Sequence, residues 1–166
     1  MRQRLAAAVL EKAMESYRER NQGQVVARAG AIFAALTNSQ YSGLLAESEE
    51  GVANQLFVVR AKDGSRLDVS SLSDGSADQL FLALRMASIE QRAATSEPLP
   101  CIFDDILVNY DDVRTASALR ELAELSGTTQ VLLFTHHEKT IELAEKNCSA
   151  QYMLHRLGGQ AVAQHA

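Results

Sequence analysis

Apolar residues recur at helical spacing at the start of the chain, every four positions at Leu5, Val9, Ala13 and Tyr17. After a polar interruption at residues 21–24, the same period resumes at Val25 and continues to Leu36. Side chains three or four positions apart share one face of a helix. Residues 1–40 are therefore predicted to be helical, either as one long helix weakened at Gly23 or as two helices in line.

The next segment has the composition of a β-hairpin. Residues 55–60 (QLFVVR) are rich in β-branched and aromatic side chains, which favour strands. The pair Asp63-Gly64 is a turn signal, and residues 66–69 (RLDV) would form the returning strand. We predict a small antiparallel element after the first helix.

From residue 70 onward, short apolar runs alternate with helical patterns. Strands are predicted at 101–103, 129–134 and 151–154, and helices at 76–92, 112–125 and 138–146. Strands that alternate with helices indicate an α/β fold with a mainly parallel sheet. We assign this lobe to residues 41–157 and a flexible tail to residues 158–166.

Composition places the chain among soluble proteins. It has 166 residues, of which 46% are hydrophobic and 22% are charged, with a net charge of −5. No apolar run approaches the roughly 18 residues that a membrane span needs, and the first residues do not resemble a secretory signal. The widely separated Cys101 and Cys148 predict reduced thiols. We expect a cytoplasmic protein without membrane association.

Neither the charge distribution nor the histidine spacing indicates a binding site. Residues 1–40 carry six basic and three acidic side chains, an excess too weak to establish nucleic-acid binding. His136 and His137 are adjacent, and neighbouring residues on a helix or strand do not share a face. Their spacing therefore argues against a shared metal ion.

Three polar clusters lie where an α/β sheet places function. Asp104-Asp105 and Thr135-His136 each follow a predicted strand, and ligands bind at the carboxyl ends of parallel strands. The segment 73–76 (SDGS) opens a helix, where free N–H groups and the helix dipole favour an anion such as phosphate. Singly, each cluster is common as a helix cap. The order and spacing of the three clusters together indicate a function more specifically than any one cluster does.

Together the clusters resemble the C-terminal half of an ABC-type ATPase head. Residues 72–79 (LSDGSADQ) resemble the ABC signature of SMC-like ATPases, and residues 101–105 (CIFDD) resemble Walker B. Residues 109–111 (NYD) lie where the D-loop falls, and residues 134–136 (FTH) resemble the H-loop with its switch histidine. The whole pattern, over about residues 10–157, is similar to the YhaN-type SMC-like bacterial ATPases.

The resemblance implies ATP and Mg²⁺ at a head-to-head dimer interface. Asp104 would hold Mg²⁺, Asp105 would orient or deprotonate the attacking water, and His136 would contact the γ-phosphate. Most ABC enzymes carry Glu where Asp105 stands, so water placement could differ. The γ-phosphate of the ATP on the opposite subunit would be gripped by Ser73, Gly75 and Ser76. The dimer interface would include Asn109 and Asp111, whereas Gln79 would stabilise the signature helix.

One family motif is missing from the sequence. A P-loop needs G-x-x-x-x-G-K-[ST], and none of the four lysines follows a glycine. In SMC-like proteins, Walker A lies in an N-terminal lobe beyond a long coiled coil. The resemblance thus implies a C-terminal lobe with a stub of coiled coil, completed by a partner lobe that carries Walker A. We expect the isolated chain neither to bind ATP tightly nor to hydrolyse it.

Other functions remain open at the level of sequence. The chain could be a free-standing, non-catalytic interaction module derived from such a head. A phospho-receiver domain also gathers aspartates at strand ends, but the long first helix and the hairpin do not fit it. SMC-like relatives act in DNA repair and chromosome maintenance, so DNA is an expected target of the complete protein.

Overall fold

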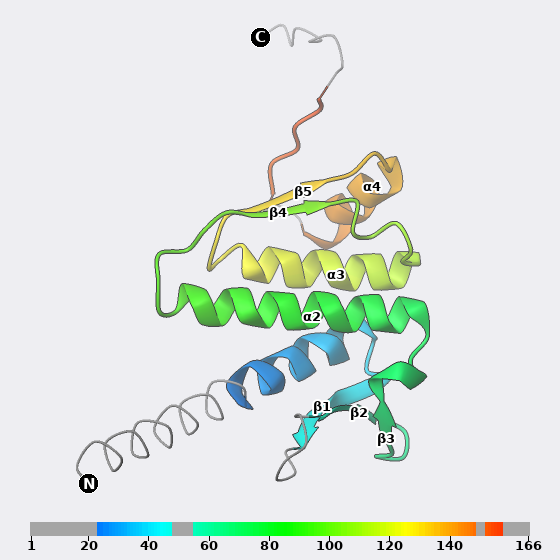
Figure 1. The fold of residues 1–166 in the computed structure, drawn as a ribbon. Coiled ribbons are helices and arrows are strands. Elements are labelled where there is room, and N and C mark those ends of the chain that lie inside the picture. Colours follow the sequence, from blue (N-terminus) through cyan, green and yellow to red (C-terminus); the bar gives the residue numbers. More distant parts are fainter. Residues whose placement is uncertain (1–22, 48–54, 149–151, 158–166) are drawn as a thin grey trace, which may run out of the picture.

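The computed structural model describes residues 23–47, 55–148 and 152–157 (Figure 1). A helix over residues 23–36, termed the leading helix, comes first. The other elements are β1 (Tyr41–Glu47), β2 (Gln55–Arg60), β3 (Arg66–Asp68), the 3₁₀ helix η1 (Val69–Ser71), α2 (Asp74–Ala93), β4 (Cys101–Asp104), α3 (Asp112–Leu125), β5 (Val131–Phe134) and α4 (Glu138–Asn147). Within these ranges, no helix combines the length and apolarity needed to cross a bilayer.

The leading helix belongs to the core of the molecule. Its fully buried side chains follow the helical period, at Ala29, Ile32, Phe33 and Leu36. Gly30 allows the close approach to β1, because a β-carbon there would lie 2.9 Å from the Leu44 backbone nitrogen. Asn38 and Ser39, with φ of 50° and 61°, end the helical backbone. The predicted helical stretch before residue 23 lies outside the described residues.

The first sheet is antiparallel, with strand order β1-β2-β3. The predicted hairpin is confirmed, since Gly64 has φ +67° and the Asp63 carboxylate accepts a hydrogen bond from the Ser65 amide at 3.0 Å. Strand β1 was not predicted. A register shift between Tyr41 and Gly43 interrupts the alternation of its side chains, which hides the strand in the sequence.

The second sheet consists of the parallel strands β4 and β5, paired in register from Cys101↔Val131 to Asp104↔Phe134. Both strands were predicted, as were the helices that follow them. The predicted strand at 151–154 is wrong for its described residues, because 152–157 adopt no strand conformation. These residues run away from the sheet in Figure 1, and a strand requires a neighbour to pair its backbone groups.

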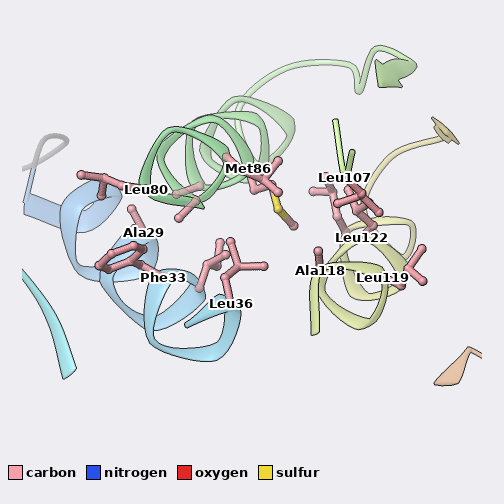
Figure 2. Packing of buried hydrophobic residues seen from close by; sticks show 14 of the residues in the cluster. Ala29, Phe33, Leu36, Leu80, Met86, Leu107, Ala118, Leu119 and Leu122 are labelled. Atoms are coloured by element: carbon pink, nitrogen blue, oxygen red, sulfur yellow. The ribbon is translucent and has the colours of Figure 1, made fainter. Parts of the chain in front are cut away.

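Helix α2 lies between the two halves of the fold (Figure 1). Figure 2 shows Leu80 and Met86 of α2 directed toward side chains of the leading helix and of the α3 region. All of them belong to one continuous buried cluster, which includes Phe33, Leu107 and Leu122. The leading helix and the segments that carry the polar clusters are therefore packed on a shared core.

Candidate functional site

The ends of β4 and β5 bring Asp105 and His136 together. The Asp105 amide donates to the Phe134 carbonyl at 2.9 Å, which extends the strand pairing by one residue. Asp105 then has φ +49°, and its carboxylate turns toward the loop after β5. There the Thr135 hydroxyl donates to Asp105 Oδ1 at 3.1 Å, and His136 Nδ1 contacts Oδ2. Two predicted catalytic residues thus share one hydrogen-bonded cluster.

The environment of Asp105 keeps its carboxylate ionised. Desolvation raises the pKa, but the hydrogen bond from Thr135 and the attraction to His136 lower it and outweigh that penalty. The net pKa of Asp105 is therefore below its ordinary value. At neutral pH this residue is a hydrogen-bond acceptor, as a general base must be. The neighbouring imidazole of His136 is largely exposed, with 72% of its side chain accessible.

Asp104 faces a different environment from Asp105. It alternates with the buried Phe103, so its side chain lies on the same side of the sheet as Ile102. That side exposes Ile102, Leu132 and Phe134, with 67%, 38% and 41% of each residue accessible. We term these three residues the open sheet face. The predicted metal ligand therefore lies at the margin of an uncovered apolar surface.

The carboxylate of Asp104 fits the magnesium that the resemblance implies. Mg²⁺ prefers oxygen ligands and is bound by one or two carboxylates together with phosphates and water. Asp104 is exposed at the carboxyl end of β4, where an ion and a phosphate group can reach it. Asp104 therefore supplies a hard oxygen donor of the kind that such an ion needs.

The signature segment forms the first turn of α2. Ser73 is the N-cap, and its Oγ accepts a hydrogen bond from the Ser76 amide at 3.4 Å. Ser73 itself is exposed, whereas Ser76 is 1% accessible and its Oγ accepts from the Ser73 hydroxyl at 3.1 Å. Of the two serines, only Ser73 presents its side chain to an incoming ligand. The capping role expected of this segment is present in the structure.

Arg114 joins the signature to the D-loop segment. A β-carbon on Gly75 would lie 3.3 Å from Arg114 Nη1, so the guanidinium packs directly on the glycine. Arg114 Nε also lies 3.6 Å from Asp111 Oδ2, and Asp111 caps α3 by accepting from the Arg114 amide at 2.8 Å. Sequence reasoning missed Arg114, because its neighbour Gly75 is remote in sequence. The cap that Asp111 forms on α3 was not predicted either.

The rest of the D-loop segment is divided between surface and core. Asn109 is exposed, while Tyr110 packs against the buried cluster. Burial raises the pKa of Tyr110 to about 12, so this phenol remains neutral. Among the described residues, no hydrogen bond or ion pair connects the signature segment or Asn109 to Asp105 and His136. The predicted site residues therefore form two separate groups on this chain.

His137 is a further member of the Asp105 cluster. Its ring centroid lies 3.9 Å from that of His136, although adjacent residues were predicted not to share a side. That prediction is wrong because both residues lie beyond the end of β5, in irregular backbone before α4. His137 Nε2 is buried and has no hydrogen-bond partner within the part of the chain that the structure describes.

Gln79 stabilises the position of helix α2, which is the part of its predicted role that the hydrogen bonds show. It is fully buried, and its Nε2 donates to the Leu36 carbonyl at 2.7 Å. This bond satisfies one of the free carbonyls at the end of the leading helix. It also holds the first turns of α2 against the leading helix.

The comparison with curated proteins supports the resemblance found in the sequence. The uncharacterized protein YhaN of Bacillus subtilis (strain 168) is 30% identical over 132 residues, which is 78% of this chain. The chain spans 13% of the length of that relative. No family model matches the chain. The predicted similarity to YhaN is thus confirmed for the matched segment.

Solved structures agree on the fold. A chain described for ATP-driven dimerization and DNA-stimulated activation of SMC ATPases aligns with TM-score 0.62 and 16% identity, over 79% of this chain and 78% of that one. The Smc head domain of Pyrococcus yayanosii aligns with TM-score 0.65 and 18% identity, over 82% of this chain and 26% of that one. The Smc head domain of Pyrococcus furiosus, bound to the C-terminal domain of ScpA, aligns with TM-score 0.58 and 17% identity. The alignment covers 84% of this chain and 36% of that one.

The chain therefore has the fold of part of an SMC ATPase head, as predicted. The three-stranded antiparallel sheet, the parallel pair β4–β5 and their helices are elements of that fold. The similarity to SMC heads also removes the phospho-receiver domain as an interpretation of the aspartates.

Proposed function

We propose that this chain supplies the C-terminal half of an SMC-like ATPase head. In this role it contributes signature, Walker B, D-loop and H-loop to ATP bound at a head-to-head interface. The observation that carries the proposal is the meeting of an ionised Asp105 with His136 at the ends of two parallel strands. A lobe that bears Walker A must complete the site.

The proposed chemistry divides between the two strand ends. Asp105 accepts a hydrogen bond from the attacking water and orients or deprotonates it, while Thr135 holds the carboxylate in place. His136 is exposed enough to leave Asp105 and contact the γ-phosphate. Asp104 would hold Mg²⁺, and the bound ion would neutralise charge on the terminal phosphates.

The signature would act on ATP held by the opposite head. Ser73 and the N-terminus of the 20-residue α2 offer a hydroxyl and free N–H groups to the γ-phosphate. Gly75 keeps the backbone open, and the adjacent Arg114 adds positive charge. Ser76 supports the turn from inside, and Asn109 and Asp111 would lie at the dimer interface. Within the described residues, no hydrogen bond or ion pair ties this group to Asp105, which is compatible with an action in trans.

The open sheet face supports the requirement for a second lobe. Ile102, Leu132 and Phe134 form a contiguous apolar surface beside Asp104. Burial of apolar surface is favourable by about 25 cal/mol per Å². A Walker A lobe docked there would bury this surface and bring the P-loop to the Walker B carboxylate.

We place the complete protein in the cytoplasm and expect DNA to be its target. One matched structure concerns SMC ATPases that DNA activates. The matched Pyrococcus furiosus head is bound to ScpA. We extend only the DNA connection to this chain, as a role in DNA repair or chromosome maintenance.

The decisive experiment combines this chain with a lobe that carries Walker A, supplied either by a preceding region of the same gene or by a separate chain. We expect ATP and Mg²⁺ to drive dimerisation in light scattering, and phosphate to be released. Asp105→Asn should abolish phosphate release while dimers still form, whereas Ser73→Arg should prevent the dimers. The matched control is Ser71→Arg, just outside the signature. Turnover by the isolated chain that Asp105→Asn abolishes would refute the need for a second lobe.

A non-catalytic interaction module is the second candidate. The open sheet face favours it equally, since any apolar partner surface could cover these residues. The module requires binding that is independent of ATP and insensitive to Ser73→Arg. The same mixing experiment therefore separates the two functions.

A further inference from the structure

We infer that Asp105, His136 and His137 form a binding site for a transition-metal dication such as Zn²⁺. We further infer that an ion bound there inhibits ATP hydrolysis. Binding of the ion stands on the geometry alone, whereas its inhibitory effect rests on the proposed function.

The three side chains already converge. Each offers one ligand atom, and the three atoms lie within 4.8 Å of one another. Zinc binds imidazole nitrogen and carboxylate oxygen at about 2.0–2.2 Å, so the ligands of one ion lie roughly 3–4 Å apart. His136 must move slightly away from Asp105, with which it is in direct contact. Its exposure leaves the ring free to make that adjustment.

His137 Nε2 provides an independent reason to expect a ligand. It is buried, and nothing within the described residues accepts or donates a hydrogen bond to it. A buried polar atom without a partner costs about 1–3 kcal/mol. We assign this nitrogen as the ligand atom of His137, and coordination to a metal ion would satisfy it.

Thr135 orients the site through two hydrogen bonds. Its hydroxyl donates to Asp105 Oδ1 at 3.1 Å, which leaves Oδ2 available for coordination. Thr135 Oγ1 also accepts a hydrogen bond from the His137 amide at 3.2 Å. One side chain thus holds two of the three ligands, as the outer partners of metal ligands commonly do.

The donor set distinguishes this ion from magnesium. Two imidazoles and one carboxylate suit Zn²⁺, Co²⁺ or Ni²⁺, whereas Mg²⁺ requires oxygen ligands such as Asp104. Three protein ligands also leave a fourth position open to water. An ion in this site would occupy the Asp105 oxygen and the His136 ring. Neither residue could then orient the attacking water or contact the γ-phosphate.

Binding is tested on the purified chain with Zn²⁺ by titration calorimetry, and with Co²⁺ by visible absorption. We expect one ion per chain and d–d bands of cobalt bound by nitrogen and oxygen. His137→Ala should weaken binding at least tenfold, and circular dichroism should show that the variant is folded. His155→Ala, at an exposed histidine in residues 152–157, is the matched control and should bind as the wild type does. Unchanged affinity of a folded His137→Ala variant, or the absence of stoichiometric binding, would overturn the site.

Inhibition is tested separately in the completed head with excess Mg²⁺. Each protein is compared with its own rate without zinc. Micromolar Zn²⁺ should suppress phosphate release by the wild type to a much smaller fraction of that rate than it does for His137→Ala. Zinc that binds without inhibiting would overturn the regulatory part of the inference. If zinc binds the chain but the completed head releases no phosphate at all, the proposed function fails while the metal site stands.

Discussion

The two sheets of this molecule differ in how much of their surface the chain itself covers. The antiparallel sheet β1–β3 is built from consecutive segments and packs on the leading helix, with Val58 fully buried. The parallel pair β4–β5 carries Asp104, Asp105 and His136 at its ends and leaves its open sheet face exposed. The sheet that the chain covers contributes to the core, and the sheet that it leaves open carries the proposed catalytic residues.

This difference explains why a stable fold and a catalytic site need not coincide. Packing of the leading helix, α2 and α3 yields one continuous core without a second lobe. The strand ends of β4 and β5 are positioned by that core, yet their apolar side remains open. Substitutions in the two regions should therefore affect different measurements.

The largest contrast is expected between two isoleucines. Ile32 in the leading helix is fully buried, and Ile32→Ala should destabilise the chain by about 2–5 kcal/mol because it leaves a cavity. Ile102 is 67% accessible, and Ile102→Ala should change stability by only about 0.5 kcal/mol. Urea denaturation of both variants provides the measurement.

In an assembly assay, we expect the larger effect at Ile102 instead of at Ile32. With a Walker A lobe present, Ile102→Asp should abolish association because it places a charge in the buried contact. Equal destabilisation of the isolated chain by the two alanine variants would show that β4–β5 is already covered.

An intermediate effect is expected at two glycines of the leading helix. Gly30→Ala should cost about 1–3 kcal/mol, because its β-carbon would lie 2.9 Å from the Leu44 nitrogen and force β1 away. Gly23 has no atom within 4 Å of such a carbon, so Gly23→Ala should stabilise by up to about 1 kcal/mol through helix propensity. Thermal unfolding of the pair measures the difference. Stabilisation by both substitutions would contradict the close packing of helix and sheet.

The smallest effect is expected at the end of β5. Thr135→Val removes the hydrogen bond that lowers the pKa of Asp105, so this pKa should rise toward or above its ordinary value. A depressed carboxylate pKa contributes stability above the unfolded pKa and loses it as pH falls through the folded pKa. For Asp105 that window lies below about pH 4, near and under the ordinary value for this side chain.

Carbon-detected NMR titration of the Asp105 carboxyl provides the measurement for Thr135→Val. Thr128→Val, in the loop before β5, is the control and should leave this pKa unchanged. An unaltered Asp105 pKa in Thr135→Val would mean that His136 alone keeps the carboxylate ionised.

Regular elements were predictable because their signals are local. Helix α3 spans Asp112–Leu125, which is the range predicted from the sequence. Strand β1 was missed because its bulge breaks the period. The open sheet face was also hidden, since residues 131–134 (VLLF) are apolar throughout and do not reveal which side is covered.

The candidate site was predictable where strand ends define it. Asp105 and His136 meet because parallel strands end at the same edge of a sheet. Arg114 and His137 were missed for different reasons. The contact of Arg114 with Gly75 depends on how α2 packs beside α3, and His137 turns toward its neighbour only because the strand has ended.

The backbone at Asp105 narrows the choice of amino acid that evolution or design can place there. With φ +49°, the residue occupies the left-handed region, which Asp and Asn adopt far more readily than most other residues. Glutamate, the usual residue in the related enzymes, would add a methylene in a conformation that disfavours it. Exchange between the two acids is therefore not conservative in this chain. Asparagine preserves the conformation and removes only the charge, so it separates the chemistry of this position from its geometry.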